Sequence, residues 1–218
     1  MKPFIVFEGP EGSGKTTQII LLKKYLDNLG LRVLTTKQPG GDDPLCVELR
    51  EVLLRNRNNS VSARTELLLF EADRAQHVDF VLIPALTSPE YDVVICSRYE
   101  ASSFAYQSVA RNVCSKEEFE FINSFATRKL EPSYSVFLDI DPLLGKKRKL
   151  GQKSLDGIES EDISFYRAVR KGFYEYFENI DSNKWMRIDG QASEEAVHQL
   201  IVENITNFFL THNTKPLV

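Results

Sequence analysis

The sequence predicts an α/β fold with a five-stranded, mostly parallel sheet and helices on both of its faces. Two observations lead to this prediction. Short apolar runs alternate with stretches of helical periodicity along all 218 residues, and the first apolar run passes through a glycine-rich turn directly into a helix. Such alternation is typical of parallel sheets, because two parallel strands need a crossover connection that is usually a helix. The length suits a single domain over residues 1–218.

Five apolar runs are expected to be the strands. Each is short, contains β-branched or aromatic residues and is followed by polar or turn-forming residues, as strands of a buried sheet are. In chain order the runs are Lys2–Glu8, Arg32–Thr36, Tyr91–Ser97, Tyr134–Ile140 and Trp185–Asp189. Because ligands gather at the carboxyl ends of parallel strands, the residues that follow each run are the ones to search for function.

Stretches with the period of a helix lie between and after these runs. They are Lys15–Leu29, Leu45–Leu54, Ala63–Leu86, Ser102–Ala110, Lys116–Arg128, Pro142–Leu150, Asp162–Ile180 and Ser193–Leu210. Their alternation with the strands predicts a sheet that is covered on both faces.

The turn after the first strand carries the clearest motif. Gly9–Thr16 reads GPEGSGKT, a complete G-x-x-x-x-G-K-[ST] phosphate loop between a strand and a helix. The glycines let backbone N–H groups face a polyphosphate, while Lys15 supplies a positive charge and Thr16 a hydroxyl for Mg²⁺. A glycine-rich turn without a ligand is the alternative. The motif predicts a P-loop NTPase three-layer fold with an ATP site formed by Gly9, Pro10, Glu11, Gly12, Ser13, Gly14, Lys15, Thr16 and Thr17.

The composition is that of an ordinary globular protein, with 42% hydrophobic and 27% charged residues. A net charge of −4 argues against a nucleic-acid partner, so anionic ligands would need local positive charge. The sequence has no signal-like stretch and no apolar run of about 18 residues, so no membrane partner and a cytoplasmic location are expected. Cys46, Cys96 and Cys114 have neither close pairing nor metal-like spacing, which favours reduced thiols.

Three further segments follow strands or lie on the longest helix. Residues 37–41 read KQPGG, Leu67–His77 reads LLLFEADRAQH, and residues 97–107 begin with SRY and end with AYQ. Together with the phosphate loop, in order from about Pro3 to Leu210, they resemble the bacterial thymidylate kinase family, whose patterns are R-E-P-G-G, L-L-F-x-A-D-R-A-Q-H and D-R-Y-x-x-S-x-x-A-Y-Q. Their joint occurrence is far more specific than the phosphate loop alone.

The resemblance implies a kinase that uses ATP and Mg²⁺ to phosphorylate dTMP, with no general base, since the acceptor oxygen is already anionic. It implies that Lys15, Arg98 and Arg148 stabilise charge and that Thr16 faces the metal. It also implies a homodimer that forms through the long helices, including Ala63–Leu86. The implied acceptor pocket consists of Glu11, Gln38, Arg50, Phe70, Arg74, Arg98, Ser103, Tyr106 and Gln107.

Two of these residues also have a physical rationale of their own. Phe70 and Arg74 lie four apart on one helix face, so an aromatic plane and a guanidinium can address one flat, polar heterocycle together. As an exposed pocket residue, Arg74 would be dispensable for folding. In the alternative interpretation, Phe70 is a core residue and Arg74 is a surface ion-pair partner of Glu71 or Asp73.

The other pocket residues have ordinary alternatives as well. Arg50 and Arg98 could grip a phosphate with the bidentate fork of a guanidinium, or each could be a surface charge. Tyr106 could be ordinary helix packing.

Residues 148–161 are expected to form a lid. Lys146–Lys149 is a basic run at the end of a helix, and Arg148 matches a family arginine just before the lid. A closing cation would neutralise charge during phosphoryl transfer. For the run as a whole, a solvated helix end that complements the helix dipole is the alternative. Residues 189–192 resemble the family loop that borders adenine.

Four positions depart from the family pattern. Lys37 and Gln38 replace Arg and Glu, Ser97 replaces an Asp that is thought to help organise Mg²⁺, and Gly157 replaces a lid Arg. If Ser97 does not serve the metal, Glu11, or a carboxylate after the fourth strand such as Asp139 or Asp141, would have to supply the missing charge.

Two other functions therefore stay open. The departures allow a nucleotide-binding protein that has lost turnover. A deoxynucleoside kinase is the other, and it would need a carboxylate near the end of the first strand to take the proton of a sugar hydroxyl.

Overall fold

The protein is described here by a computed structural model that covers residues 1–55, 61–150 and 162–211. These residues form a five-stranded sheet in the order β2-β3-β1-β4-β5, and every pairing in it is parallel. The strands are β1 (Phe4–Glu8), β2 (Val33–Lys37), β3 (Val93–Ser97), β4 (Tyr134–Asp139) and β5 (Trp185–Asp189). The predicted fold class is therefore confirmed, and all five predicted strands are present.

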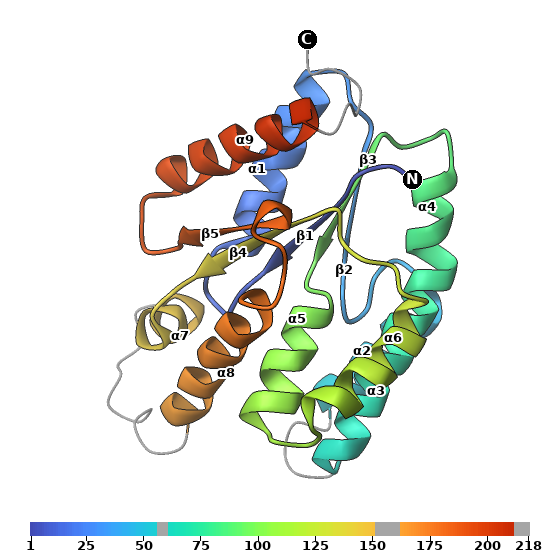
Figure 1. The fold of residues 1–218 in the computed structure, drawn as a ribbon, viewed down its shortest axis with the longest axis vertical. Helices are drawn as coiled ribbons and strands as arrows, with labels where there is room; N and C mark the ends of the chain where they lie inside the picture. Colours follow the sequence, from blue (N-terminus) through green and yellow to red (C-terminus); the bar gives the residue numbers. More distant parts are fainter. Residues whose placement is uncertain (56–60, 151–161, 212–218) are drawn as a thin grey trace.

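Helices connect the strands and cover both faces of the sheet (Figure 1). They are α1 (Lys15–Asn28), α2 (Pro44–Arg55), α3 (Ala63–His77), α4 (Ile83–Thr87), α5 (Glu100–Ser103), α6 (Lys116–Thr127), α7 (Pro142–Leu150), α8 (Asp162–Phe177) and α9 (Glu194–Thr211). Shorter turns are the π-helical η1 (Val78–Leu82) and η2 (Phe104–Ala110) and the 3-10 turn η4 (Ser182–Lys184).

Two predicted helices contain a π-helical turn that the sequence pattern did not indicate. The expected helix Ala63–Leu86 is helical throughout, but its hydrogen-bonding pattern changes along its length, which divides it into α3, η1 and α4. Pro84, near the start of α4, has no N–H to donate to the carbonyl four residues earlier, which accounts for the change of ladder there. The second π turn, η2, carries Tyr106 and Gln107, and such turns are frequent at functional sites.

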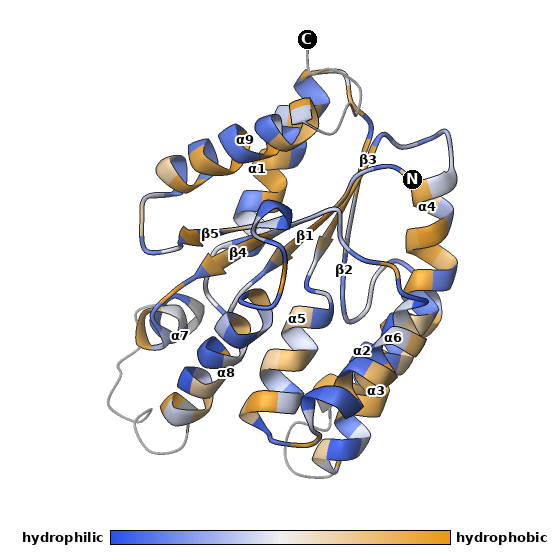
Figure 2. Ribbon diagram, viewed as in Figure 1, coloured by the Kyte–Doolittle hydropathy of each residue, from blue (hydrophilic) through white to orange (hydrophobic). Residues whose placement is uncertain are grey.

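Alternate side chains of the strands face two separate cores. Ile5 and Phe7 of β1 pack with α1 and α9 on one face of the sheet, whereas Phe4 and Val6 pack with η1 and α4 on the other. Figure 2 shows the consequence: the central strands β1, β3 and β4 are mostly hydrophobic, while the outer helices have one hydrophobic and one hydrophilic side. Each fully buried aliphatic or aromatic side chain stabilises the fold by about 1.5–3 kcal/mol.

A third apolar cluster joins the helices on the second face. Phe137 of β4 stacks on Phe173 and Phe177 of α8, with ring centroids 5.3 Å apart in both pairs. Ala101 and Ala105 of α5 and η2 complete this cluster. It holds α8 against η2, which places the residues at the start of α8 beside the carboxyl end of the sheet.

None of the helices formed by residues 1–55, 61–150 and 162–211 combines the length and apolar character needed to cross a membrane.

Candidate active site

A cavity of about 1000 Å³ lies at the carboxyl ends of the strands. Its wall contains the turns after β1, β2, β3 and β5, together with parts of α2, α3, η2 and α8. The predicted site residues that line it are Glu11, Gly12, Ser13, Gly14, Lys15, Thr16, Thr17, Gln38, Arg50, Phe70, Arg74, Arg98, Ser103, Tyr106, Gln107 and Arg148. Gly9 and Pro10, also predicted, are not part of the wall; their carbonyls instead hold Lys15. The volume is at the upper end of the range for small-molecule sites, which leaves room for two ligands.

The ammonium group of Lys15 is held inside the phosphate loop. Its Nζ atom donates to the carbonyls of Gly9 at 2.8 Å and Pro10 at 2.7 Å, and to the Ser13 hydroxyl at 3.2 Å. Burial, and then the positive charge of Arg98, lower the pKa of Lys15 well below its ordinary value. A polyphosphate placed in the loop would offset both effects, because it supplies the negative charge that this desolvated ammonium lacks.

The phosphate loop and helix α7 meet backbone to backbone. A Cβ atom on Gly12 would overlap the backbone of Gly145, and one on Gly145 would lie 2.5 Å from the carbonyl oxygen of Glu11. Further along α7, Arg148 donates from Nη1 to the carbonyl of Gly190 at 2.6 Å, in the turn after β5. These contacts place Arg148 between the phosphate loop and the predicted adenine loop.

The chain turns sharply after β3. Arg98 has a φ of 67°, a left-handed conformation that is costly for a residue with a side chain. Two hydrogen bonds hold this turn: Arg98 N donates to the carbonyl of Phe7 at 2.9 Å, and Tyr99 N donates to the Glu8 carboxylate at 2.7 Å. The turn directs Arg98 into the cavity wall beside the phosphate loop.

The guanidinium of Arg98 lies between the phosphate loop and the α5–η2 segment. It donates to the carbonyl of Gly9 at 3.2 Å and to the Ser102 hydroxyl at 3.0 Å, and it lies over the ring of Tyr106 at 5.3 Å. A charged group at this position can therefore reach ligands in either half of the cavity.

Glu8, the last residue of β1, is a structural residue that the motif search missed. Its carboxylate is buried and accepts from Tyr99 N, from Ser102 N at 3.2 Å and from the Ser102 hydroxyl at 2.5 Å. It thereby fixes the turn that carries Arg98. The signal in the sequence was a single carboxylate at the end of an otherwise apolar strand.

Arg74 is buried, which corrects the expectation that it is an exposed pocket residue. It does pair with Glu71, as the alternative interpretation proposed, but this pair lies inside the protein and not on the surface. Burial opposes the charge of Arg74, yet the Glu71 carboxylate keeps its pKa above the ordinary value. Phe70 is half-buried and lines the cavity, whereas the alternative placed it in the core.

Arg74 is held on every side by hydrogen bonds. Nε donates to Gln38 Oε1 at 3.1 Å, and Nη1 donates to Glu71 and to Asn123 Oδ1 at 3.4 Å. Nη2 donates to the carbonyl of Tyr99 at 2.9 Å and to the Ser103 hydroxyl at 3.0 Å. These five contacts match the five N–H groups of a guanidinium, so Arg74 is a fixed part of the wall.

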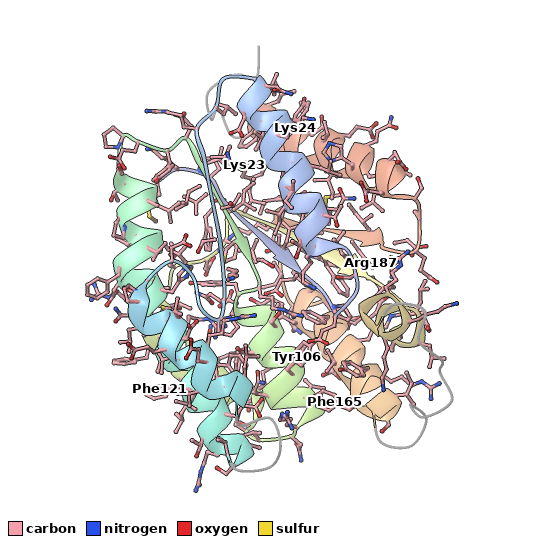
Figure 3. The ribbon with its side chains drawn as sticks, turned by 180° about the vertical axis from the view of Figure 1, so that it is seen from behind. Lys23, Lys24, Tyr106, Phe121, Phe165 and Arg187 are labelled. Carbon is pink, nitrogen blue, oxygen red and sulfur yellow. The ribbon has the colours of Figure 1, made fainter. Side chains whose placement is uncertain are left out.

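The remaining acceptor-side residues come from several elements. Arg50 of α2 donates to the carbonyl of Pro39 at 2.8 Å, and Gln107 donates to the Glu66 carboxylate at 3.1 Å. Tyr106 meets Phe165 of α8 edge to face, with the ring centroids 6.2 Å apart (Figure 3). Some wall residues were not predicted, because packing of α3 and α8 on η2 brings them together and no local motif marks them. Examples are Glu66, Arg111, Phe165 and Tyr166.

Of the three carboxylates proposed as substitutes for Ser97, Asp139 and Asp141 are engaged elsewhere, whereas Glu11 lines the cavity. Asp139 is paired with Arg170 at 2.7 Å and accepts from the Tyr174 hydroxyl at 2.5 Å, and Asp141 accepts from backbone N–H groups at the start of α7. Neither lines the cavity, which corrects that suggestion. Within the described ranges, no group of three or more His, Cys, Asp or Glu side chains is arranged to hold a metal ion.

The cavity wall nevertheless contains oxygen donors that suit Mg²⁺. Thr16 and Ser97, whose side chains carry hydroxyl groups, and Glu11, whose side chain carries a carboxylate, all line the cavity. Mg²⁺ in nucleotide sites keeps several waters and takes few protein ligands, with phosphates supplying the rest. This sparse set therefore fits the ion. The predicted lid beyond Leu150, including Gly157, lies outside the described residues.

Comparison with known proteins is consistent across sequence and structure. The sequence profile described as thymidylate kinase matches residues 7–201. Curated thymidylate kinases from Trichormus variabilis and Acholeplasma laidlawii are 43% and 42% identical to the chain, over 92% and 93% of its length and 93% and 98% of theirs. The crystal structure of thymidylate kinase from Ehrlichia chaffeensis superposes with a TM-score of 0.74 at 26% identity, covering 94% of this chain and 98% of that one.

Proposed function

The chain belongs to the thymidylate kinase family, whose reaction is the ATP-dependent phosphorylation of dTMP, and we propose how its residues divide that reaction between two halves of one cavity. The donor half is the phosphate loop with Arg148 and the turn after β5. The acceptor half contains Gln38, Arg50, Phe70, Arg74, Ser103, Tyr106 and Gln107. The observation that carries this division is the position of Arg98, which contacts Gly9 on one side and lies over Tyr106 on the other.

In this proposal the donor phosphates lie in the phosphate loop. The backbone of Gly9–Thr17 and the start of α1 receive them, and Lys15 moves its donors from the loop carbonyls to phosphate oxygens. Arg148 neutralises charge from the side of α7. Phosphoryl transfer depends mostly on such positioning and charge neutralisation, so these residues need not exchange a proton.

The acceptor is dTMP. Arg50 and Arg98 hold its phosphate, and Phe70 stacks on its base beside the fixed guanidinium of Arg74. Tyr106 and Gln107 border its sugar and base, and Glu11 faces its sugar. Because the acceptor oxygen of a monophosphate is already anionic, no general base is assigned.

Mg²⁺ is proposed as the required metal. Thr16 would hold it directly and Ser97 through water, and the bound ion would supply positive charge to the donor phosphates. The hydroxyl of Ser97 can orient such a water but, unlike a carboxylate, adds no charge of its own.

A deoxynucleoside kinase would need a carboxylate near the end of β1 as a base for a sugar hydroxyl. Three donors from Tyr99 and Ser102 engage the Glu8 carboxylate, which does not line the cavity, so Glu11 is the candidate for that role. Arg50 and Arg98, by contrast, suit an acceptor that already carries a phosphate.

A homodimer is proposed through an apolar patch on η1 and α6. Phe80, Phe121 and Phe125 are 65%, 78% and 84% exposed. Arg128, just after α6, pairs with Asp79 at 2.8 Å, so the two segments lie side by side. Large exposed aromatic groups that gather in this way are typical of association surfaces. Phe121 lies at the outer edge of the molecule in Figure 3.

A cytoplasmic location is part of the proposal. The three thiols are free, and two of them, Cys46 and Cys96, are buried. Free thiols are usual in reducing compartments, where ATP and deoxynucleotides are also made.

Steady-state turnover across acceptors tests the proposal. With ATP and Mg²⁺, ADP release should give a higher kcat/KM for dTMP than for dUMP, dCMP, dGMP, AMP or thymidine, because a wrong base leaves buried polar groups unpaired. The Lys15→Ala variant serves as the inactive control. Equal or better use of thymidine would contradict the assignment, and binding of both nucleotides without ADP release would identify a protein that has lost turnover.

A further inference from the structure

A chain of buried polar side chains leads from Arg74 into the protein. Arg74 Nε lies 3.1 Å from Gln38 Oε1, Gln38 Nε2 lies 2.8 Å from His77 Nδ1, and His77 Nε2 lies 2.7 Å from the Thr36 hydroxyl. The exposed fractions are 2% for Arg74, 4% for Gln38, 0% for His77 and 8% for Thr36. A chain of this kind is stable only when each donor meets an acceptor.

Hydrogen-bond chemistry fixes the direction of this chain. Arg74 can only donate, so the carbonyl oxygen of the Gln38 amide must face it. The Gln38 amide nitrogen then faces His77, and because this nitrogen also only donates, His77 Nδ1 must accept and carry no proton. The single proton of the neutral imidazole therefore lies on Nε2 and is donated to Thr36. Burial, with the nearby charge of Arg74, lowers the pKa of His77 to about 4, which keeps the ring neutral at physiological pH.

The chain ties together three elements. Thr36 belongs to β2, Gln38 to the loop after it, and His77 and Arg74 to α3. Gly41 in the same loop lies against the imidazole: a Cβ there would be 2.5 Å from His77 Cδ2. His77 therefore packs against the loop and also accepts a hydrogen bond from it.

We infer that Gln38 and His77 are positioning residues for acceptor recognition, which set the plane of the Arg74 guanidinium and, through Nη2, the hydroxyl of Ser103. The inference rests on the proposed assignment of Arg74 and Ser103 to the acceptor half. Glu71 already provides the counter-charge of Arg74, so the residue at position 38 needs only to orient the guanidinium. An amide that is itself held by a neutral imidazole does this without adding a second negative charge.

A matched pair of variants at position 77 tests the inference. In His77→Asn, the amide oxygen can occupy the place of Nδ1 and still accept from Gln38. His77→Leu fills a similar volume but cannot accept. His77→Leu should raise the KM for dTMP about three- to ten-fold, the equivalent of one neutral hydrogen bond, with the kcat and the KM for ATP changed by less than about two-fold. His77→Asn should restore most of the dTMP affinity.

Equal KM values for dTMP in His77→Leu and the wild-type enzyme would overturn the inference, as would a parallel loss of ATP affinity. If His77→Leu does not fold, His77→Asn and Gln38→Leu provide the same comparison from the two ends of one hydrogen bond. Gln38→Leu should raise the KM for dTMP while His77→Asn does not.

Nitrogen NMR of the wild-type protein tests the direction of the chain without any activity. Between about pH 6 and pH 8, the His77 resonances, assigned by their loss in His77→Asn, should show a proton on Nε2 and none on Nδ1. In Gln38→Glu both carboxylate oxygens only accept, so a proton should appear on Nδ1. A proton on Nδ1 in the wild-type protein would overturn the inference even if dTMP is phosphorylated. Failure of the proposed function would look different, with the Nε2 proton present and dTMP not used.

Discussion

Arg74 and Glu71, three residues apart on α3, form an ion pair with only 3% and 4% of their side chains exposed. Arg74 lies in the wall of the cavity and also joins α3 to Gln38, Tyr99 and Ser103. A residue expected to read a base therefore also holds together the turn after β3 and the loop after β2. Its replacement should affect folding and binding together.

Arg74→Ala should lower the free energy of unfolding by about 3–5 kcal/mol, because it leaves the buried Glu71 carboxylate without its counter-charge. It should also weaken dTMP binding. Urea unfolding and calorimetric titration with dTMP measure the two effects. Arg50→Ala is the matched control: Arg50 is only half-buried and donates to the carbonyl of Pro39, so dTMP binding should fall with little loss of stability. Wild-type stability in Arg74→Ala would contradict the structural role of the pair.

The titrations of Asp73 and His77 should act on stability in opposite directions. Burial raises the pKa of Asp73 from 3.8 to about 6, so the folded protein holds that proton more tightly and loses stability as the pH rises from about 4 to 6. Burial lowers the pKa of His77 from 6.5 to about 4, so its contribution is present above about pH 6.5 and is lost as the pH falls through 4. Each contribution is about 3 kcal/mol, and the two nearly cancel between pH 4 and 6.

A variant that lacks one of these two titrating side chains should reveal the pH dependence of stability that the other contributes. Relative to the wild-type protein, the stability of Asp73→Asn should rise more steeply from pH 4 to 6, and that of His77→Asn should fall over the same interval. Chemical unfolding at several pH values measures the slopes. The neighbouring charges are Arg74 and Arg50 for Asp73, and Arg74 and Asp43 for His77. Unchanged slopes in both variants would contradict the two pKa shifts.

The strands could be predicted from sequence because each is a short apolar run with both faces buried, so local composition and burial coincide. The π-helical turn within Ala63–Leu86 could not be located from the sequence, because it depends on how the helical hydrogen bonds rearrange before Pro84. The thymidylate kinase resemblance was confirmed because its motifs are contiguous in the sequence. The burial of Arg74 was missed because its partners Gln38, Tyr99 and Asn123 come from three distant segments.

Glu66, Arg111 and Phe165 were missed for a related reason. Arg111 pairs with Glu66 at 3.2 Å and lies over the ring of Phe165 at 5.2 Å, a contact that exists only because α3, η2 and α8 converge at the cavity. Helical periodicity indicates which face of a helix is apolar but not which helices meet. The individual roles of the predicted site residues remain predictions that kinetics must test.

Arg148→Ala should lower the kcat by more than it weakens ATP binding, because a cation that approaches the moving charge acts mainly on the transition state. A loss of about ten- to a thousand-fold in kcat is expected. Single-turnover rates and ATP titration separate the two effects. Lys147→Ala, an exposed neighbour that does not line the cavity, is the matched control and should leave the kcat unchanged. Normal turnover in Arg148→Ala would remove this residue from the mechanism.

Ser97→Asp should lower the Mg²⁺ concentration required for half-maximal rate. Ser97 ends β3 in register with Lys37 on one side and Phe7 on the other, so a carboxylate there would face the cavity beside the phosphate loop. A carboxylate adds charge that the serine hydroxyl cannot supply. Activity measured against Mg²⁺ concentration tests this, with Ser97→Asn as an uncharged control of similar size. Unchanged Mg²⁺ dependence with slower turnover would contradict this prediction, and would mean that the charges of the site already suit a serine at position 97.

Replacing both Phe121 and Phe125 with Glu should convert the proposed dimer into a monomer, because it places charge in the apolar patch on α6. Sedimentation velocity measures the change. Ile20→Glu, at another exposed apolar side chain, on α1, is the control and should not alter association. A wild-type protein that sediments as a monomer would contradict the proposed dimer.

The glycine contact between the phosphate loop and α7 has a mechanical consequence. Side chains usually separate packed segments and absorb small displacements by changing rotamer, but none stands between Gly12 and Gly145. A change in the curvature of the loop is therefore transmitted rigidly to the helix that carries Arg148. We therefore expect occupancy of the nucleotide site to be coupled to the position of Arg148 through this backbone contact.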